Sequence, residues 1–192
     1  MSQQQPGGPD RLLTFDDLVA SYDKKIFNTI FRILGDYDEA ADVTQETFIS
    51  AYKSFDKFRG DSHVYTWLYQ IAINQCRNRL RQRERSRAIK VESLDQSRAW
   101  DTEEESGPQE VADSSMAPHT VLEEKELSNR IASAVEALPP EYREVVILRE
   151  VQGLSYNEIA EATSLSLDNV KTRLSRARIM LRRKLEPYYR DN

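Results

Sequence analysis

The residues best suited to chemistry in this chain are arginine, lysine and amide side chains gathered in two segments. Residues 74–90 carry seven basic residues against one acidic residue, and residues 171–184 carry seven basic residues and no acidic one. The formal net charge of the whole chain is −5, so both segments are strongly basic although the protein as a whole is acidic. Guanidinium groups bind phosphates and donate to base edges. The pattern indicates two separate nucleic-acid-binding modules.

The C-terminal basic segment belongs to a helix-turn-helix pattern, SYNEIAEATSLSLDNVKTRLSRARIML, at residues 155–181. Ser155 followed by Glu158 is typical of a capping box, and Ser164 stands at the turn position that usually holds Gly. The second helix presents a polar set outward, which suits the major groove: Asp168, Asn169, Lys171, Thr172, Ser175 and Arg176. A helical hairpin with a solvated basic face is the alternative, but seven basic groups without an acid disfavour it.

The other segment, FRGDSHVYTWLYQIAINQCRNRLRQR at residues 58–83, places aromatic residues ahead of a polar and basic helix. Trp67, Ile71, Asn74 and Asn78 share one helical face. Aromatic rings stack on unpaired bases, and amides read the Watson–Crick edges of those bases. On composition alone, the alternative of core aromatics with solvated arginines stays open.

Catalytic and metal-binding functions find no support in the sequence. Cys76 is the only cysteine, and His63 and His119 are the only histidines, which disfavours a metal centre. No glycine-rich phosphate loop or nucleophile motif is present, so we expect no enzyme, no cofactor and no small-molecule substrate. The N-terminus lacks a signal peptide, and no apolar run is long enough to span a membrane. We therefore expect a cytoplasmic protein.

The periodicity of apolar residues predicts an all-α chain with two small helical domains. Residues 1–11 are expected to be a disordered leader, and residues 93–120 a flexible acidic linker without periodicity. The expected helices cover 14–34, 38–55, 63 into the arginine run, 121–137, 140–153, 155–162 and 166–184. Thr14 with Asp17 resembles a capping box that starts the first helix, and Gly35 is a plausible stop for it.

Two blocks of the sequence, residues 42–80 and 138–178, together resemble bacterial extracytoplasmic-function (ECF) sigma factors of the sigma-E type. The resemblance implies sigma region 2 at 12–92, sigma region 4 at 121–187 and a tail at 188–192. It implies an RNA polymerase sigma factor that initiates transcription of a stress or envelope regulon. The implied partners are core polymerase (its β′ clamp helices and β flap), promoter DNA and an anti-sigma factor, which would hold the protein at the inner membrane.

The resemblance also implies roles for individual residues. The positions that match the core-polymerase contacts are Asp42, Gln45, Glu46 and Tyr52. Those that match recognition and melting of the −10 element are Arg59, Gly60, Asp61, Ser62, Tyr65, Trp67, Asn74, Arg77 and Asn78. Those that match the −35 contacts are Arg149, Tyr156, Lys171, Thr172, Arg173, Ser175 and Arg176. The competing hypotheses are a free-standing dimeric helix-turn-helix regulator and an anti-terminator that binds single-stranded RNA.

Overall fold

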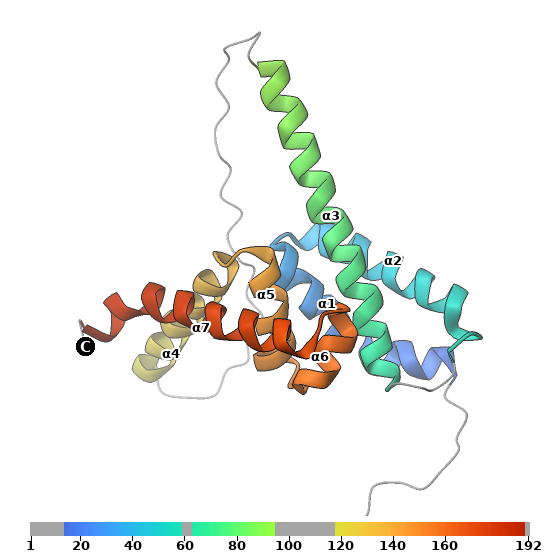
Figure 1. The fold of residues 1–192 in the computed structure, drawn as a ribbon. Coiled ribbons are helices and arrows are strands. Elements are labelled where there is room, and N and C mark those ends of the chain that lie inside the picture. Colours follow the sequence, from blue (N-terminus) through green and yellow to red (C-terminus); the bar gives the residue numbers. More distant parts are fainter. Residues whose placement is uncertain (1–13, 59–62, 95–117, 191–192) are drawn as a thin grey trace, which may run out of the picture.

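The computed structural model describes residues 14–58, 63–94 and 118–190, and every regular element within them is a helix. The predicted leader and most of the predicted linker lie outside the described residues. The helices form two modules, which Figure 1 shows in blue to green for the first and in yellow to red for the second. The prediction of an all-α chain with two helical units is therefore confirmed.

Three long helices make the first module: α1 (Phe15–Leu34), α2 (Tyr37–Phe55) and α3 (Val64–Leu94). Thr14 and Asp17 form the predicted capping box at the start of α1. Gly35, with a φ of 73°, ends that helix in the left-handed conformation that glycine adopts without strain. The next residue, Asp36, accepts a hydrogen bond of 2.8 Å from the backbone N–H of Glu39 and so caps α2.

The core of the first module lies where α1, α2 and the first half of α3 meet. Fully buried side chains come from all three helices: Leu18, Ile26, Ile30, Val43, Leu68, Ala72 and Ile73. From Arg81 to Ile89, α3 has no buried residue, and this half projects away from the module (Figure 1). Arg83 is its anchor, because it pairs with Glu39 at 2.7 Å and donates to the Leu34 carbonyl at the end of α1.

The second module consists of α4 (Pro118–Glu136), α5 (Pro140–Val146), a π-helical turn η1 (Ile147–Val151), α6 (Tyr156–Thr163) and α7 (Leu167–Arg190). We predicted one helix for residues 140–153, but its second half is η1. There the N–H of Gln152 donates to the carbonyl of Ile147 at 3.1 Å, five residues earlier. The pattern of apolar residues does not distinguish a π-helical turn from an α-helical one, because Ile147 and Leu148 are buried in both cases.

Three predicted boundaries differ from the structure. Helix α3 continues to Leu94 and α4 begins at Pro118, so both ends of the predicted linker are helical. Helix α7 continues past the predicted end at 184 and through Pro187. The ring of Tyr188 covers the guanidinium of Arg130 on α4, 4.5 Å from the ring centroid. The predicted helix ended at residue 184 because the periodicity of apolar residues ends there, and Tyr188 lies beyond that point.

The helix-turn-helix forms as predicted from α6 and α7. Ser155 and Glu158 make the capping box of α6. Ser164 occupies the turn with a φ of 55°, the conformation for which glycine is the usual residue. Ile159, Val170 and Leu174 are buried between the helices, which fixes the position of α7 on the rest of the module.

Removing the cap at Ser155 is expected to destabilise the second module. Ser155→Ala leaves the N–H of Glu158 without its side-chain acceptor, and loss of such a cap lowers the free energy of unfolding by about 1 kcal/mol. Urea denaturation followed by circular dichroism measures the change. Ser155→Asp, which keeps a capping oxygen, is the control. Equal loss of stability in both variants would show that the cap contributes nothing here.

The two modules pack against each other. Helix α6 lies along α3, and both α5 and η1 contact α1. Buried apolar residues of both modules form one continuous core, and Arg143 of α5 donates to the carbonyl of Ile33 on α1 at 2.7 Å. No sequence pattern predicted this contact, since periodicity within one helix does not specify which distant helix covers it.

Candidate nucleic-acid interface

One face of α3 carries the polar residues that the sequence assigned to unpaired DNA. Asn74 and Asn78 are both exposed. Trp67 is half-buried against Phe55 and Phe58, with ring centroids 6.4 and 5.1 Å away. This packing holds the indole at the edge of the module, beside the solvent-facing amides. Four further residues that the sequence analysis assigned to the −10 element, Arg59–Ser62, lie outside the described residues.

The other predicted −10 residues of α3, Tyr65 and Arg77, face the second module instead. The Tyr65 hydroxyl donates to the carboxylate of Glu158 on α6. This hydrogen bond raises the pKa of Tyr65 and lowers the pKa of Glu158. Nearby, the Tyr69 hydroxyl donates to the Gln152 side-chain oxygen at 2.8 Å, and the burial of Tyr69 raises its pKa to about 12.

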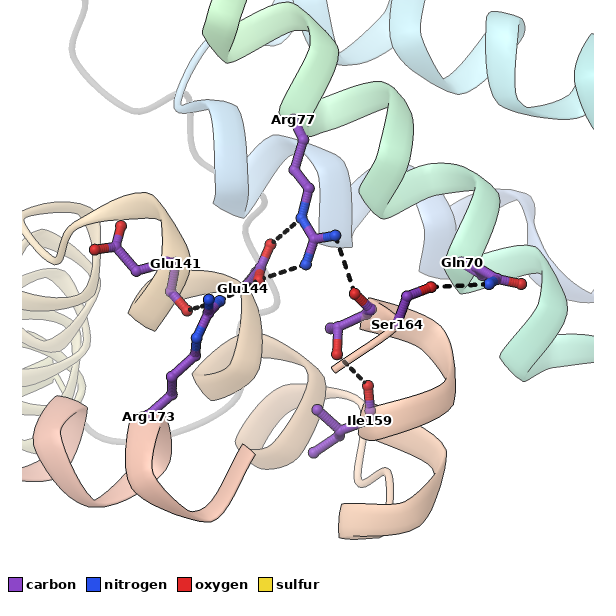
Figure 2. Close-up of polar contacts among 8 residues, drawn as sticks. Gln70, Arg77, Glu141, Glu144, Ile159, Ser164 and Arg173 are labelled. Carbon is purple, nitrogen blue, oxygen red and sulfur yellow. Dashed lines mark hydrogen bonds and ion pairs between the residues drawn. The ribbon is translucent and has the colours of Figure 1, made fainter. Parts of the chain in front are cut away.

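Arg77 forms the centre of the contact between the modules (Figure 2). Its Nε and Nη2 donate to the two carboxylate oxygens of Glu144 at 2.9 and 2.7 Å. Its Nη1 donates at 3.0 Å to the carbonyl of Thr163, the last residue of α6, where a positive charge is favourable. Arg173 of α7 also binds Glu144, at 3.1 Å. The Glu144 side chain is 5% exposed, so two arginines balance one buried acid.

Helix α7 exposes most of the residues predicted to contact the −35 element. Lys171, Thr172, Ser175 and Arg176 are all exposed. Lys171 and Ser175 line a groove together with Tyr156 of α6. Arg173, by contrast, is turned toward Glu144 (Figure 2) and lies away from this surface.

The groove also includes residues that the sequence analysis did not select: Arg178, Ile179 and Arg182. Arg178 and Arg182 follow Ser175 by three and seven residues, so helical spacing alone was a sufficient signal. Arg178 donates to Glu150 at 2.9 Å, which raises the pKa of its guanidinium. Arg149, a predicted contact, donates to the Leu154 carbonyl at 2.8 Å and lies over the Tyr156 ring at 5.2 Å. These contacts fix Arg149 beside the groove.

A separate apolar groove of about 620 Å³ lies between α1 and α2. Two predicted polymerase contacts, Gln45 and Tyr52, line it beside Phe48 and Ile49. Ile49 and Tyr52 are 47% and 68% exposed, and together with Phe48 they give the groove a contiguous apolar surface of the kind that protein partners cover. The other two predicted contacts, Asp42 and Glu46, are exposed on α2, and Glu46 pairs with Arg79 at 3.3 Å.

The described residues hold no cluster of metal-binding side chains, and none of their helices is apolar and long enough to cross a membrane. Cys76 is buried, and burial raises its pKa to about 12. The faces of α3 and α7 described above present hydrogen-bond donors, aromatic rings and positive charge, which are the groups that proteins use to contact nucleic acid.

Comparison with known families matches each module to a different domain. Residues 18–86 match "Sigma-70 region 2", and residues 128–181 match "Sigma-70, region 4". The chain is 37% identical over 177 residues to the RNA polymerase sigma-H factor of Pseudomonas aeruginosa, covering 92% of this chain and 89% of that one. It is 35% identical to the ECF RNA polymerase sigma-E factor of Escherichia coli, covering 92% and 88%. The chain belongs to the ECF sigma factors.

Solved structures agree with the fold of this sigma factor. The sigma factor RpoE of Bartonella quintana, in complex with the anti-sigma factor NepR, aligns with a TM-score of 0.67 at 23% identity, over 91% of this chain and 98% of that one. CnrH in complex with the cytosolic domain of CnrY aligns with a TM-score of 0.60 at 25% identity, over 90% and 88%. A match to region 2 separates this sigma factor from a free-standing helix-turn-helix regulator, which needs no such domain.

Proposed function

We propose that this sigma factor directs core RNA polymerase to promoters through three separate surfaces. The groove between α1 and α2, with Asp42, Gln45, Glu46 and Tyr52, takes the β′ clamp helices. The α3 face reads the −10 element, and α7 reads the −35 element. One observation carries the proposal: an exposed apolar groove and two exposed polar faces, on α3 and α7, occur on one chain whose modules match sigma regions 2 and 4.

Strand separation at the −10 element follows from the chemistry of the α3 face. Flipping a base out of the duplex costs a few kcal/mol, and stacking on an aromatic ring returns roughly 1–3 kcal/mol per base. Trp67 offers a partly exposed ring, while the exposed amides of Asn74 and Asn78 offer donors and acceptors to a base edge. Contacts between α3 and the unpaired bases thereby favour the separated strand over the duplex. Core polymerase, not this chain, catalyses RNA synthesis.

Recognition of the −35 element is assigned to the exposed surface of α7, and Arg176 provides its test. Arg176→Ala is expected to weaken binding to a matched −35 sequence by about 1–3 kcal/mol and to relax specificity there. Holoenzyme binding to matched and mutated −35 duplexes measures both effects. Arg32→Ala, which removes an exposed arginine from α1, is the control and should change neither affinity. Equal losses on both duplexes would make Arg176 a phosphate contact that carries no sequence information.

Regulation by an anti-sigma factor is part of the proposal. One of the structural relatives, RpoE of Bartonella quintana, is a sigma factor in complex with an anti-sigma factor. The same partner class suits this chain, because the exposed groove between α1 and α2 offers a protein-binding surface. We place the protein in the cytoplasm, where it meets polymerase, with an anti-sigma factor able to hold it at the inner membrane.

Assembly with polymerase tests the proposed function. The purified chain is mixed with core polymerase and separated by size, and the recovered complex is footprinted on promoter DNA. We expect one chain per core enzyme and protection of the −35 and −10 elements that neither component gives alone. A chain that leaves core polymerase unbound would contradict the proposal.

A further inference from the structure

The face of α3 that carries Trp67, Asn74 and Asn78 continues beyond the core of the first module. With about 3.6 residues per helical turn, Arg81 and Arg85 lie on the same side of the helix as the two asparagines. Asn78, Arg81 and Arg85 also line one cleft of about 220 Å³. The proposed function uses only the first half of this face, so the projecting half has no role assigned to it.

The charges on the projecting half of α3 are not neutralised within the described part of the chain. Arg81 and Arg85 are exposed, and neither makes an ion pair with a described residue. Arg83 lies on the opposite side of the helix, where Glu39 holds it. Arginines four residues apart on a helix repel each other, and no packing compensates here, because this half projects away from the module (Figure 1). Such a surface favours an anionic partner.

The cleft around these two arginines is polar throughout. Its other lining residues are Glu46, Gln75, Asn78, Arg79 and Gln82. The one acid among them, Glu46, is already paired with Arg79 at 3.3 Å, so Arg81 and Arg85 give the cleft a net positive charge. Guanidinium groups and side-chain amides are donors that bind phosphate oxygens, whereas an apolar protein surface would find nothing here to pack against. The chemistry of the cleft therefore favours a nucleic-acid backbone.

The place of the projecting half along α3 indicates which part of the DNA it meets. Arg85 follows Asn74 by eleven residues, and at about 1.5 Å per residue the two lie roughly 16 Å apart along the helix. This length corresponds to about five base pairs of duplex at about 3.4 Å each. After α3 the chain leads to the second module, to which the proposed function gives the −35 element. The projecting half therefore extends from the −10 element toward the duplex upstream.

We propose that Arg81 and Arg85 hold the phosphate backbone of the promoter duplex immediately upstream of the −10 element. Arginine binds phosphate oxygens whatever the base, so this contact adds affinity without adding sequence information. It anchors the duplex beside the point of strand separation, where Asn74 and Asn78 meet the unpaired bases. This inference rests on the proposed function, since it extends the DNA-binding surface of α3.

Holoenzyme binding to fork-junction DNA tests the inference. Each probe carries a single-stranded −10 element from a promoter that the holoenzyme transcribes, lacks a −35 element, and has an upstream duplex of about two or about twelve base pairs. We expect the wild type to bind the long probe about tenfold more tightly than the short one. Arg81→Gln with Arg85→Gln should lose most of this gain, and its plot of log affinity against log salt should be less steep by roughly 2. Glutamine is a good helix former, and circular dichroism confirms the fold.

Two further double variants make the result specific. Lys24→Gln with Arg32→Gln makes the same charge change at exposed positions of α1 and should bind as the wild type does. Arg81→Lys with Arg85→Lys keeps the charge and should keep both the gain and the salt dependence.

Three results would overturn the inference. The first is an unchanged salt dependence in the glutamine variant, and the second is a loss that varies with the base sequence of the upstream duplex. The third is weaker assembly with core polymerase at unchanged DNA affinity, which would assign the face to a protein partner. Each of these leaves the proposed function standing. A wild-type holoenzyme that binds the probes equally well with and without a −10 element would overturn the proposed function itself.

Discussion

Asp42→Arg is expected to weaken assembly with core polymerase by about two orders of magnitude, because reversing a charge at an interface places it against a surface built for the opposite sign. Asp42 is exposed on α2, and helical spacing puts it on the same face as Gln45, Glu46 and Ile49. The substitution therefore leaves the core intact and changes only the surface offered to the partner.

The affinity of the fluorescently labelled chain for core polymerase measures this effect. Glu161→Arg, which makes the same charge change on exposed α6, is the control and should bind as the wild type does. Circular dichroism confirms that both variants fold. If Asp42→Arg and Glu161→Arg bind core polymerase equally well, the α2 face is not the docking surface.

Asn74→Ala is expected to reduce promoter opening by about one to two orders of magnitude while leaving duplex binding almost unchanged. The exposed amide of Asn74 lies on the face of α3 that carries Trp67, where a flipped base would sit. Loss of one amide contact to a base edge removes roughly 1–3 kcal/mol from the open complex. In the proposed function the duplex is held elsewhere, by α7 and by phosphate contacts.

Permanganate footprinting of the −10 strand measures the unpaired thymines directly. The experiment compares holoenzymes that contain the wild type, Asn74→Ala and Asn28→Ala, which makes the same substitution at an exposed position of α1. Asn28→Ala should open promoters normally. Normal thymine reactivity with Asn74→Ala would refute the base-pocket assignment.

Local features of the fold were predictable from the sequence because neighbouring residues determine them. The capping boxes at Thr14 and Ser155 and the helix stop at Gly35 depend on residues within one turn. The π turn at Ile147–Val151 was not predictable, since it keeps the same residues buried as an α turn does. The end of α7 was missed because Tyr188 is held by Arg130, a residue on another helix.

In the candidate site too, features set by local spacing were predictable from the sequence and contacts between distant residues were not. Helical spacing correctly placed Asn74 and Asn78 on one face, and Lys171 with Ser175 on another. The partners of Arg77 and Tyr65 were not predictable, because Glu144 and Glu158 lie 67 and 93 residues away along the chain. A single sequence contains no record of such pairing, and charge alone offers many equivalent carboxylates.

Run-off transcription with core polymerase on a library of genomic promoter fragments tests the central claim most directly. The account predicts that core polymerase with this chain transcribes a small set of fragments, which share one −35 and one −10 element at fixed spacing. It also predicts that core polymerase alone leaves these fragments silent. Transcription that is the same with and without the chain would contradict the assignment of the chain as the promoter-reading subunit.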